Sequence, residues 1–260
     1  MKKWRPSFKC IYIIPEIHGN IESLTHILDR VLPLRSHTGQ EDVIVFLGDY
    51  VDGDESGADV IETLITVKKE YGERVILLRG NHDDLFAKAI SGTNDNYNDW
   101  ITANGHSTIN SYIQKYNSYQ TIDNISATEL KELIPKEHKD FLTSLETYHI
   151  LDEYFFMHGS FDPNKTVKEN RLENFIYDVS ASRYVKDCLK KKSKPDLKDN
   201  YVFVSAHNFN TKIPFIYQKY LMLGGGAPNE LYVWDLNSME CCRIRKGKER
   251  IYPYKFSAFE

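Results

Sequence analysis

Five short hydrophobic runs along the chain each stop at a cluster of polar residues. The runs have the length and composition of buried strands, and they are Cys10–Pro15, Val43–Leu47, Val75–Leu78, Tyr154–Met157 and Tyr201–Ser205. The clusters that follow them are Glu16-Ile17-His18-Gly19-Asn20, Gly48-Asp49-Tyr50-Val51-Asp52, Gly80-Asn81-His82-Asp83, His158-Gly159 and Ala206-His207-Asn208. Because ligands of α/β folds bind beyond the carboxyl ends of the strands, these clusters predict one shared site.

The first half of the chain alternates these strands with helices. Asn20 is placed to cap a helix that runs to about Arg30. Its apolar positions recur at helical spacing, and they are Ile21, Leu24, Ile27, Leu28 and Val31. A second helix is predicted from about Gly57 to Tyr71. This alternation predicts parallel strands joined by right-handed crossovers.

The middle of the chain, residues 83–147, predicts a helical region with loops. Ser91–Asn98 is a polar loop in this interpretation, and Trp100–Tyr116 and Glu137–Leu145 are helices. The Lys-rich stretch Val185–Lys198 predicts a helical, exposed flap. Four further strands are predicted to be antiparallel, and they are Ile213–Tyr217, Leu221–Leu223, Leu231–Leu236 and Cys241–Arg245.

These elements predict an α/β fold, a two-sheet β-sandwich of mixed strands flanked by helices. Parallel βαβ units would form one side of the sandwich and a β-meander the other. We expect a single domain over residues 1–260, with a helical insert at about 84–147.

Composition narrows the class of protein. The net charge of −4 gives no field that would draw the chain to nucleic acid or to an anionic membrane, so we expect neither as a partner. The basic segment Arg243–Arg250 is interpreted as a solvated strand and turn. Four cysteines without a Cys-x-x-Cys pair predict reduced thiols and a cytoplasmic location, and the apolar stretch near the N-terminus is too short for a signal peptide.

The chemistry of the polar clusters indicates transition-metal ions. Carboxylate, imidazole and amide groups together suit Mn, Fe or Zn rather than calcium alone. Their number fits two ions that share one carboxylate, and Asp49, a short side chain on a turn, is the natural bridge. Two ions roughly 3.5–4 Å apart clamp a phosphoryl group and activate a water for in-line attack on phosphorus.

In this order, the clusters resemble the motifs of the calcineurin-like metallophosphoesterases. Those motifs are Asp-x-His, Gly-Asp-x-x-Asp-Arg-Gly, Gly-Asn-His-Glu or Gly-Asn-His-Asp, His-Ala-Gly or His-Gly-Gly, and Gly-His-Thr. Within the family the chain is most similar to the bacterial and phage serine/threonine protein phosphatases and the symmetrical diadenosine tetraphosphatases. Trp100–Tyr112 is also similar to a segment of the bacterial members. The resemblance implies a four-layer α/β/β/α fold and a hydrolase of phosphoric esters that uses two divalent ions, Mn first, with Fe, Zn or Ni as alternatives.

The resemblance also implies roles for individual residues. Glu16 and His18 would hold the first ion, Asp49 would bridge the two ions, and the second ion would be held by Asn81, His158 and His207. His82 would be the general acid that protonates the leaving group, and Asp52 would hold its imidazolium. Asn81 and His82 would also contact the substrate, a phosphoprotein or a small phosphate ester of the phosphoserine or phosphothreonine type.

The chain departs from the family pattern at four places. Glu16 replaces the first Asp, and Gly53, followed by Asp54 and Glu55, stands where the phosphate-binding Arg is expected. Ala206 replaces the Gly of Gly-His-Thr. The stretch Asn174–Asp178 lacks the Arg that bacterial members carry between the fourth and fifth motifs. Arg171 and Arg183 are the candidates to replace it, and an exposed helix charge is the alternative interpretation of both.

Two other functions stay open at this point. The first is hydrolysis of a nucleotide polyphosphate or phosphodiester, with Tyr50, Tyr177 and His106 as candidate base contacts, although packing or surface roles are the simpler interpretation of all three. The second is a degenerate, non-catalytic protein of the same fold that binds a partner. The oligomeric state is not predicted.

Overall fold

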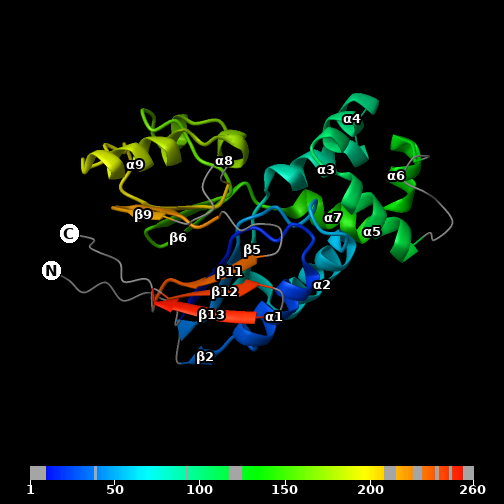
Figure 1. Ribbon diagram of the computed structural model, residues 1–260, viewed down its shortest axis with the longest axis horizontal. Coiled ribbons are helices and arrows are strands. Elements are labelled where there is room, and N and C mark those ends of the chain that lie inside the picture. Colours follow the sequence, from blue (N-terminus) through cyan, green and yellow to red (C-terminus); the bar gives the residue numbers. More distant parts are fainter. Residues whose placement is uncertain are drawn as a thin grey trace.

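The computed structural model describes residues 10–37, 40–91, 93–116, 125–207, 215–224, 230–237, 240–245 and 248–253. Within these ranges the chain forms two mixed sheets, one of six strands and one of five, and a small two-stranded sheet (Figure 1). The small sheet pairs β2 (Ser36–His37) with β3 (Gln40–Glu41). The prediction of two mixed sheets flanked by helices is therefore confirmed.

The first sheet contains the predicted parallel strands. Its order is β13-β12-β11-β1-β4-β5. The parallel strands are β1 (Ile11–Ile14), β4 (Val43–Phe46) and β5 (Val75–Leu77), joined through α1 (Ile21–Val31) and α2 (Gly57–Tyr71), and the short 3-10 turn η1 (Gly72–Arg74) precedes β5. The antiparallel strands are β11 (Glu230–Asp235), β12 (Glu240–Arg245) and β13 (Lys248–Pro253). As predicted, Asn20 caps α1 by accepting a hydrogen bond from the Ser23 N–H.

The second sheet has the order β6-β7-β8-β10-β9. Its strands are β6 (Tyr148–Leu151), β7 (Tyr154–Met157), β8 (Val202–Ser205), β9 (Phe215–Tyr217) and β10 (Tyr220–Met222). The predicted division into a parallel side and a β-meander is wrong. The hairpin β9–β10 belongs to this sheet, where β10 also pairs in parallel with β8, whereas β11 and β12 join the first sheet beside β1. The predicted strand residue Ile213 lies outside the described residues.

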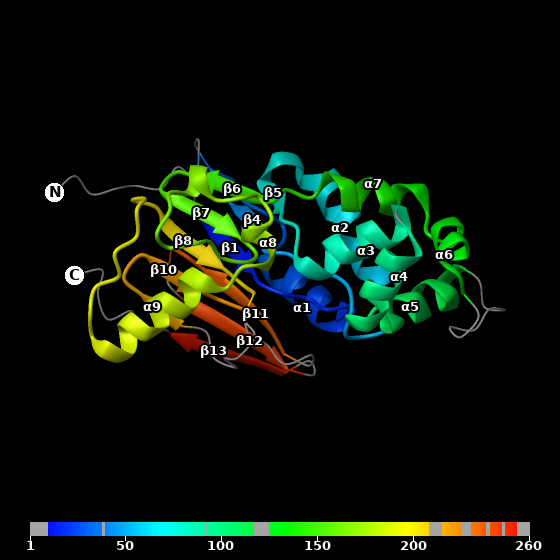
Figure 2. The same ribbon diagram turned by 90° about the horizontal axis from the view of Figure 1, so that it is seen from above.

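The elements form four layers (Figure 1), and three hydrophobic cores lie between them. Figure 2 shows the same arrangement from above. One core packs α1 and α2 against the first sheet, through side chains such as Leu24, Ile61 and Phe46. The second lies between the sheets and includes Val45 and Val204. The third covers the outer face of the second sheet with α8 (Asn174–Tyr177) and α9 (Ser180–Lys191), and includes Phe175, Ala181, Val185 and Phe203. Figure 1 shows α8 and α9 on one side of the two sheets and α1 and α2 on the other.

The segment predicted as an exposed flap differs from that prediction. The helix α9 ends at Lys191, where Lys192 adopts a left-handed conformation with φ +55°, and Pro195 follows. Its apolar side is part of the third core through Ala181 and Val185, so α9 is a layer of the fold. The short 3-10 turn η3 (Val167–Glu169) precedes α8.

The helical region after β5 contributes to the same core as α1 and α2. Its helices are α3 (Asn81–Ser91), α4 (Asn94–Thr102), α5 (His106–Tyr116), α6 (Ala127–Leu133) and α7 (Lys136–Ser144). The predicted loop Ser91–Asn98 is mostly helical, because Tyr97, Trp100 and Ile101 give α4 an apolar face that packs on the core. The predicted single helix Trp100–Tyr116 is broken after Thr102, since Asn104 has φ +79° and a Cβ at Gly105 would lie 2.5 Å from the Trp100 ring.

All four cysteines are free, and they are Cys10, Cys188, Cys241 and Cys242. None of the helices in the described ranges combines the length and the apolar content that a bilayer crossing requires.

Candidate metal centre

The polar clusters predicted from the sequence meet at one place. They follow β1, β4 and β5 of the first sheet and β7 and β8 of the second, and each of these five strands runs parallel to a neighbour. Backbone hydrogen bonds join the clusters directly: the His18 N–H donates to the Asp49 carbonyl at 2.9 Å, and the His207 N–H donates to the His158 carbonyl at 2.8 Å. Asn208 lies outside the described residues.

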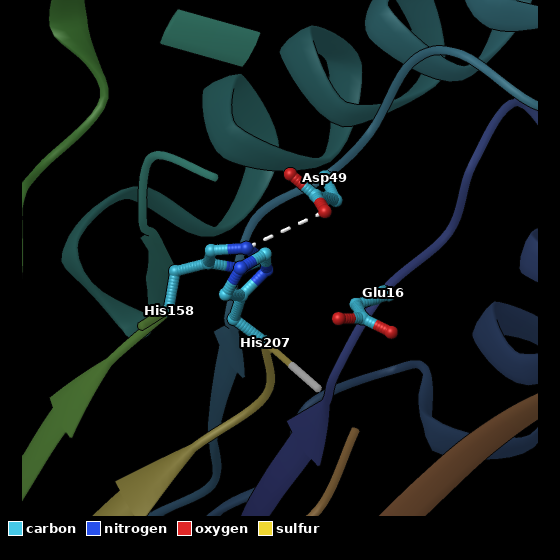
Figure 3. A group of neighbouring side chains, drawn as sticks. All are labelled: Glu16, Asp49, His158 and His207. Atoms are coloured by element: carbon cyan, nitrogen blue, oxygen red, sulfur yellow. Dashed lines mark ion pairs between the residues drawn. The ribbon is translucent and has the colours of Figure 1, made fainter. Parts of the chain in front are cut away.

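Asp49 is the residue shared by two groups of metal-ligand side chains. One group is Glu16, Asp49, His158 and His207, and the other is His18, Asp49 and His82; within each group the ligand atoms lie within 4.8 Å of one another. Figure 3 shows the first group, whose carboxylates and imidazole rings converge from separate segments of the chain. Asp49 is buried, and its position between two groups is the geometry that a bridging carboxylate needs.

His158 is oriented to present its Nε2 to this site. Its Nδ1 donates to the Leu47 carbonyl at 2.8 Å, so Nε2 is the ring nitrogen that points into the site. That nitrogen lies 3.4 Å from Asp49 Oδ2 and 3.0 Å from Asn81 Oδ1. An imidazole nitrogen, a carboxylate oxygen and an amide oxygen thus lie together, and these are ligand atoms that a divalent transition-metal ion takes. The donor set therefore fits a metal ion.

Electrostatics around Asp49 keep its carboxylate ionised and shift the pKa values of its two neighbouring histidines in opposite directions. Burial opposes ionisation of Asp49, but the neighbouring imidazoles of His158, His82 and His18 outweigh it and hold the pKa of Asp49 far below its usual range. Burial would also lower the pKa of His158, yet the Asp49 charge raises it. Burial and the repulsion from His158 lower the pKa of His207 to about 3, so this ring is neutral, as a ligand must be.

Glu16 lies in a different group from the one that the family pattern suggests. The resemblance pairs Glu16 with His18, but the Glu16 carboxylate clusters with His158 and His207 around Asp49. Glutamate is one methylene longer than the aspartate of the family, so its carboxylate reaches further from the end of β1.

His18 is fixed by the backbone of the second cluster. Its Nδ1 donates to the Asp52 carbonyl at 2.8 Å, and its Nε2 lies 3.7 Å from Asp49 Oδ2. His18, Asp49 and Asp52 all have positive φ, at +49°, +55° and +62°. Backbone in this region is costly for residues other than glycine, and clusters of it mark places where the fold holds side chains in a required geometry.

Asp52 and His82 form the predicted pair. His82 Nδ1 donates to Asp52 Oδ2 at 2.9 Å, and the Asp52 carboxylate is fully buried. Burial would lower the pKa of His82, but its hydrogen bond to Asp52 and the charge of Asp49 raise this pKa to about 9. The imidazole is thus protonated at neutral pH, the state that a general acid requires.

Two residues of the helical region complete this pair, and the sequence did not predict their roles. Trp100 Nε1 donates to Asp52 Oδ2 at 2.9 Å, and Thr108 Oγ1 donates to Asp52 Oδ1 at 2.5 Å. Both lie in the segment Trp100–Tyr112, and the similarity of this segment to the bacterial phosphatases is the sequence feature that points to them. Their positions 48 and 56 residues from Asp52 explain why local patterns could not link them.

Asp83 is a further residue whose role was missed. Its carboxylate accepts hydrogen bonds from the backbone N–H groups of Asp49, Tyr50 and Gly80 at 2.8, 2.9 and 2.9 Å. It therefore ties the cluster after β4 to the cluster after β5. Burial and the nearby Asp49 charge raise the pKa of Asp83 to about 6.

The missing arginine at position 53 has a structural explanation. Gly53 has φ +136°, and a Cβ there would lie 2.9 Å from both Cβ and O of His18. An arginine cannot occupy this backbone without moving His18. Asp54 and Glu55 beside it are exposed, so this side of the site is acidic.

Ala206 is accommodated by a neighbouring glycine. Ala206 is fully buried, and a Cβ on Gly224 would lie 1.8 Å from its carbonyl oxygen. In the family pattern, the Gly before the last His allows a close backbone approach. Here Gly224, on the neighbouring segment, is the glycine that allows the two backbones to come close.

The remaining candidates differ in their exposure. Arg171 and Arg183 are both exposed, in the segment before α8 and in α9. Tyr50 is fully buried and donates to the Leu78 carbonyl at 2.7 Å, so it packs and cannot stack on a base. His106 is exposed at the start of α5. Tyr177 is partly exposed and donates to Asp84 Oδ2 at 2.7 Å.

Relatives of the chain are phosphatases by name. The matched relatives include a Caenorhabditis elegans protein provisionally named serine/threonine-protein phosphatase C06A1.3, 33% identical over 82 residues, which are 32% of this chain and 21% of that protein. Serine/threonine-protein phosphatase SIT4 of Candida albicans is 29% identical over 102 residues, 39% of this chain and 31% of its own. The chain thus matches about a fifth to a third of the length of these relatives.

Solved structures share the fold. A protein provisionally described as a diadenosine tetraphosphatase has a TM-score of 0.58 at 14% identity, with 91% of this chain and 93% of that chain covered. The family model for calcineurin-like phosphoesterases matches residues 11–226, which include every cluster of the site. The chain therefore belongs to the calcineurin-like phosphoesterase family.

Proposed function

We propose that this protein is a metal-dependent phosphatase that hydrolyses phosphomonoesters of the phosphoserine or phosphothreonine type. The observation that carries the proposal is the position of Asp49 beside the Asp52–His82 pair. Asp49 belongs to the ligand group of Glu16, His158 and His207 and lies 3.7 Å from the Nε2 of His18. Metal ligation alone would not need a protonated histidine held by a buried carboxylate. A hydrolase that must protonate a leaving alkoxide does need one.

In this proposal, two divalent ions are held by Glu16, His18, Asp49, Asn81, His158 and His207, with Mn as the first candidate. When bound, such ions supply Lewis-acid charge to the phosphoryl oxygens and lower the pKa of water. The protein's own part is to orient the ligands, as the His158–Leu47 hydrogen bond does.

His82 acts on the leaving group. Its Nδ1 is occupied by Asp52, so Nε2 is the atom that donates a proton to the departing oxygen. Asp52 stabilises the imidazolium before the transfer and keeps the ring orientation afterwards. Asn81, the first residue of α3, lies beside His82 and contacts the phosphate from the end of the helix.

The test is hydrolysis of an aryl phosphate after incubation with Mn, together with elemental analysis. Asp49→Asn is expected to lose both metal and turnover, because the shared carboxylate loses its charge. Asp42→Asn is the matched control, a buried aspartate before β4 that accepts the Arg35 N–H at 3.0 Å outside the site, and it is expected to keep both.

A protein that binds Mn but shows no turnover at any pH would overturn the proposal in favour of a non-catalytic phosphatase-like protein. Comparison of phosphopeptides with diadenosine tetraphosphate and cyclic nucleotides tests the nucleotide alternative. That alternative has lost one of its base contacts, because Tyr50 is buried. A cytoplasmic location stays a prediction from the cysteine content.

A further inference from the structure

A polar cluster joins α3 to α8 beside the candidate metal centre. Asp84 Oδ2 accepts a hydrogen bond from the Tyr177 hydroxyl at 2.7 Å and lies 2.7 Å from Lys88 Nζ. Lys88 Nζ also lies 5.6 Å from the centroid of the Tyr177 ring, over its face. The ammonium group is therefore held on two sides, by a carboxylate and by an aromatic ring.

The cluster carries surplus positive charge. Arg79 Nη1 lies 3.3 Å from Asp84 Oδ1, so one carboxylate faces two cations. Arg79 is anchored by a hydrogen bond to the Leu142 carbonyl at 3.0 Å, and its side chain is mostly covered. The Lys88 side chain is 52% exposed, and it is the cation of the cluster that solvent can reach.

Lys88 lies on the helix that begins at the site. The helix α3 begins with Asn81 and His82, and Asp84 and Lys88 follow Asn81 on the same helical face, at the spacing i, i+3 and i+7. The ammonium group of Lys88 pairs with Asp84, which lies three residues, or roughly 5 Å along the helix axis, from Asn81. Burial raises the pKa of Tyr177, and the charges of Asp84 and Asp49 raise it further, so the phenol lies within the field of the metal centre.

An anionic substrate at this site lacks the arginine contact of the family pattern. Gly53 leaves no room for the arginine of the family, and the exposed carboxylates of Asp54 and Glu55 repel an incoming anion. A phosphomonoester near neutral pH carries close to two negative charges and gains strongly from a charge-assisted contact.

We infer that Lys88 binds the anionic substrate at the rim of the site, and that Asp84 and Tyr177 position its ammonium group. The inference rests on the proposed phosphatase function and narrows it. A lysine acts as a point charge without the planar fork of arginine, so it attracts charge but does not fix the orientation of a phosphate. The site should therefore prefer dianionic monoesters to monoanionic diesters through Lys88.

The test is a set of variants assayed on an aryl phosphate monoester and on a bis-aryl phosphodiester with Mn. Lys88→Met is expected to raise KM for the monoester about tenfold, with a smaller effect on the diester, and Lys88→Arg to restore KM to within about threefold. Tyr177→Phe keeps the ring and loses the hydrogen bond to Asp84, so an intermediate rise is expected in KM rather than in kcat. Lys136→Met is the matched control, because Lys136 forms an exposed i,i+4 pair with Asp140 in α7, and KM should not change.

A second readout does not depend on turnover. Calorimetric titration of inorganic phosphate into the Mn-loaded protein should give a Kd about tenfold higher for Lys88→Met than for wild type or Lys136→Met. Wild-type turnover with an unchanged KM and phosphate Kd in Lys88→Met would overturn this inference and leave the proposed function standing. A wild-type protein without turnover would overturn the proposed function itself. Equal KM rises for monoester and diester would show that Lys88 has only a structural role.

Discussion

The indole N–H of Trp100 donates to Asp52 Oδ2 at 2.9 Å, the same oxygen that accepts the His82 Nδ1–H. Trp100 is fully buried in α4 and stacks on Phe86, with ring centroids 4.7 Å apart. The aspartate that orients His82 is thus held by a rigid aromatic side chain from the helical region. The helical region therefore contributes to the chemistry of the site as well as to the core.

Trp100→Phe should reduce kcat by about tenfold, because the Asp52 carboxylate loses a donor and can rotate away from His82. The loss of a buried hydrogen bond to a charged group should also lower the free energy of unfolding by about 1–3 kcal/mol. Kinetics with an aryl phosphate and denaturant unfolding measure the two effects. Trp234→Phe, at a buried tryptophan between the sheets, is the control and should lower stability without a specific loss in kcat.

His82→Asn should reduce turnover by about 10²–10⁴ while metal content stays close to that of wild type. The proton donor is lost, but the backbone N–H of residue 82, which donates to Asp49 Oδ1 at 3.0 Å, remains. Single-turnover kinetics and elemental analysis separate the two quantities. Normal activity in this variant would show that another group protonates the leaving oxygen.

The pair of His82 and Asp52 should make the stability of the metal-free protein depend on pH. The pKa of His82 is raised in the folded state from 6.5 to about 9, so its stabilising contribution is fully present below about pH 6.5. It is lost as the pH rises through about 9. The free energies of unfolding of wild type and His82→Asn are measured in chelator at pH 6 and at pH 10. The difference between the two proteins should be about 2–3 kcal/mol larger at pH 6 than at pH 10. An equal difference at both pH values would contradict the raised pKa.

Gly53→Arg, which would recreate the family motif, should destabilise the protein and fail to lower KM for a phosphomonoester. The backbone at φ +136° is unfavourable for any residue with a side chain, and a Cβ at this position would lie 2.9 Å from His18 Cβ. Gly53→Ala adds only a Cβ and should lose a similar amount of stability, about 1–3 kcal/mol. Thermal unfolding and KM of both variants test this. A stable Gly53→Arg variant with a lower KM would show that the loop can adopt the family's conformation.

Features that depend on nearby residues were predictable from the sequence. Asn20 caps α1 because its side chain reaches an N–H only three residues away, and the strand from Val43 is visible as a continuous apolar run. The convergence of the polar clusters could also be inferred, because parallel strands bring their carboxyl ends to one edge. Each of these inferences needs only local spacing and one rule of topology.

Features that depend on distant partners were not predictable. The hydrogen bond between Tyr177 and Asp84 joins residues 93 positions apart, and no local pattern in either helix indicates it. The strands β9 to β12 are divided between the two sheets according to which strand edges are free for pairing. The free edge of β1 pairs with β11. The conformation of Gly53 follows from its contact with His18, so the sequence shows the missing arginine but not the reason for it.

Substitution of Asp83 tests whether a residue that is not a metal ligand controls Mn affinity by positioning Asp49. The Asp83 carboxylate accepts the N–H groups of Asp49, Tyr50 and Gly80, so Asp83→Asn turns an NH₂ group toward a backbone donor. Mn affinity should fall by about 10–100-fold, the usual effect of losing a group that orients metal ligands. Asp83→Glu retains the charge and should recover most of the affinity, because a glutamate also occurs at this position of the family motif. Calorimetric titration with Mn measures both variants, and a lower Tm with unchanged Mn affinity would mean that Asp83 stabilises the loops without positioning Asp49.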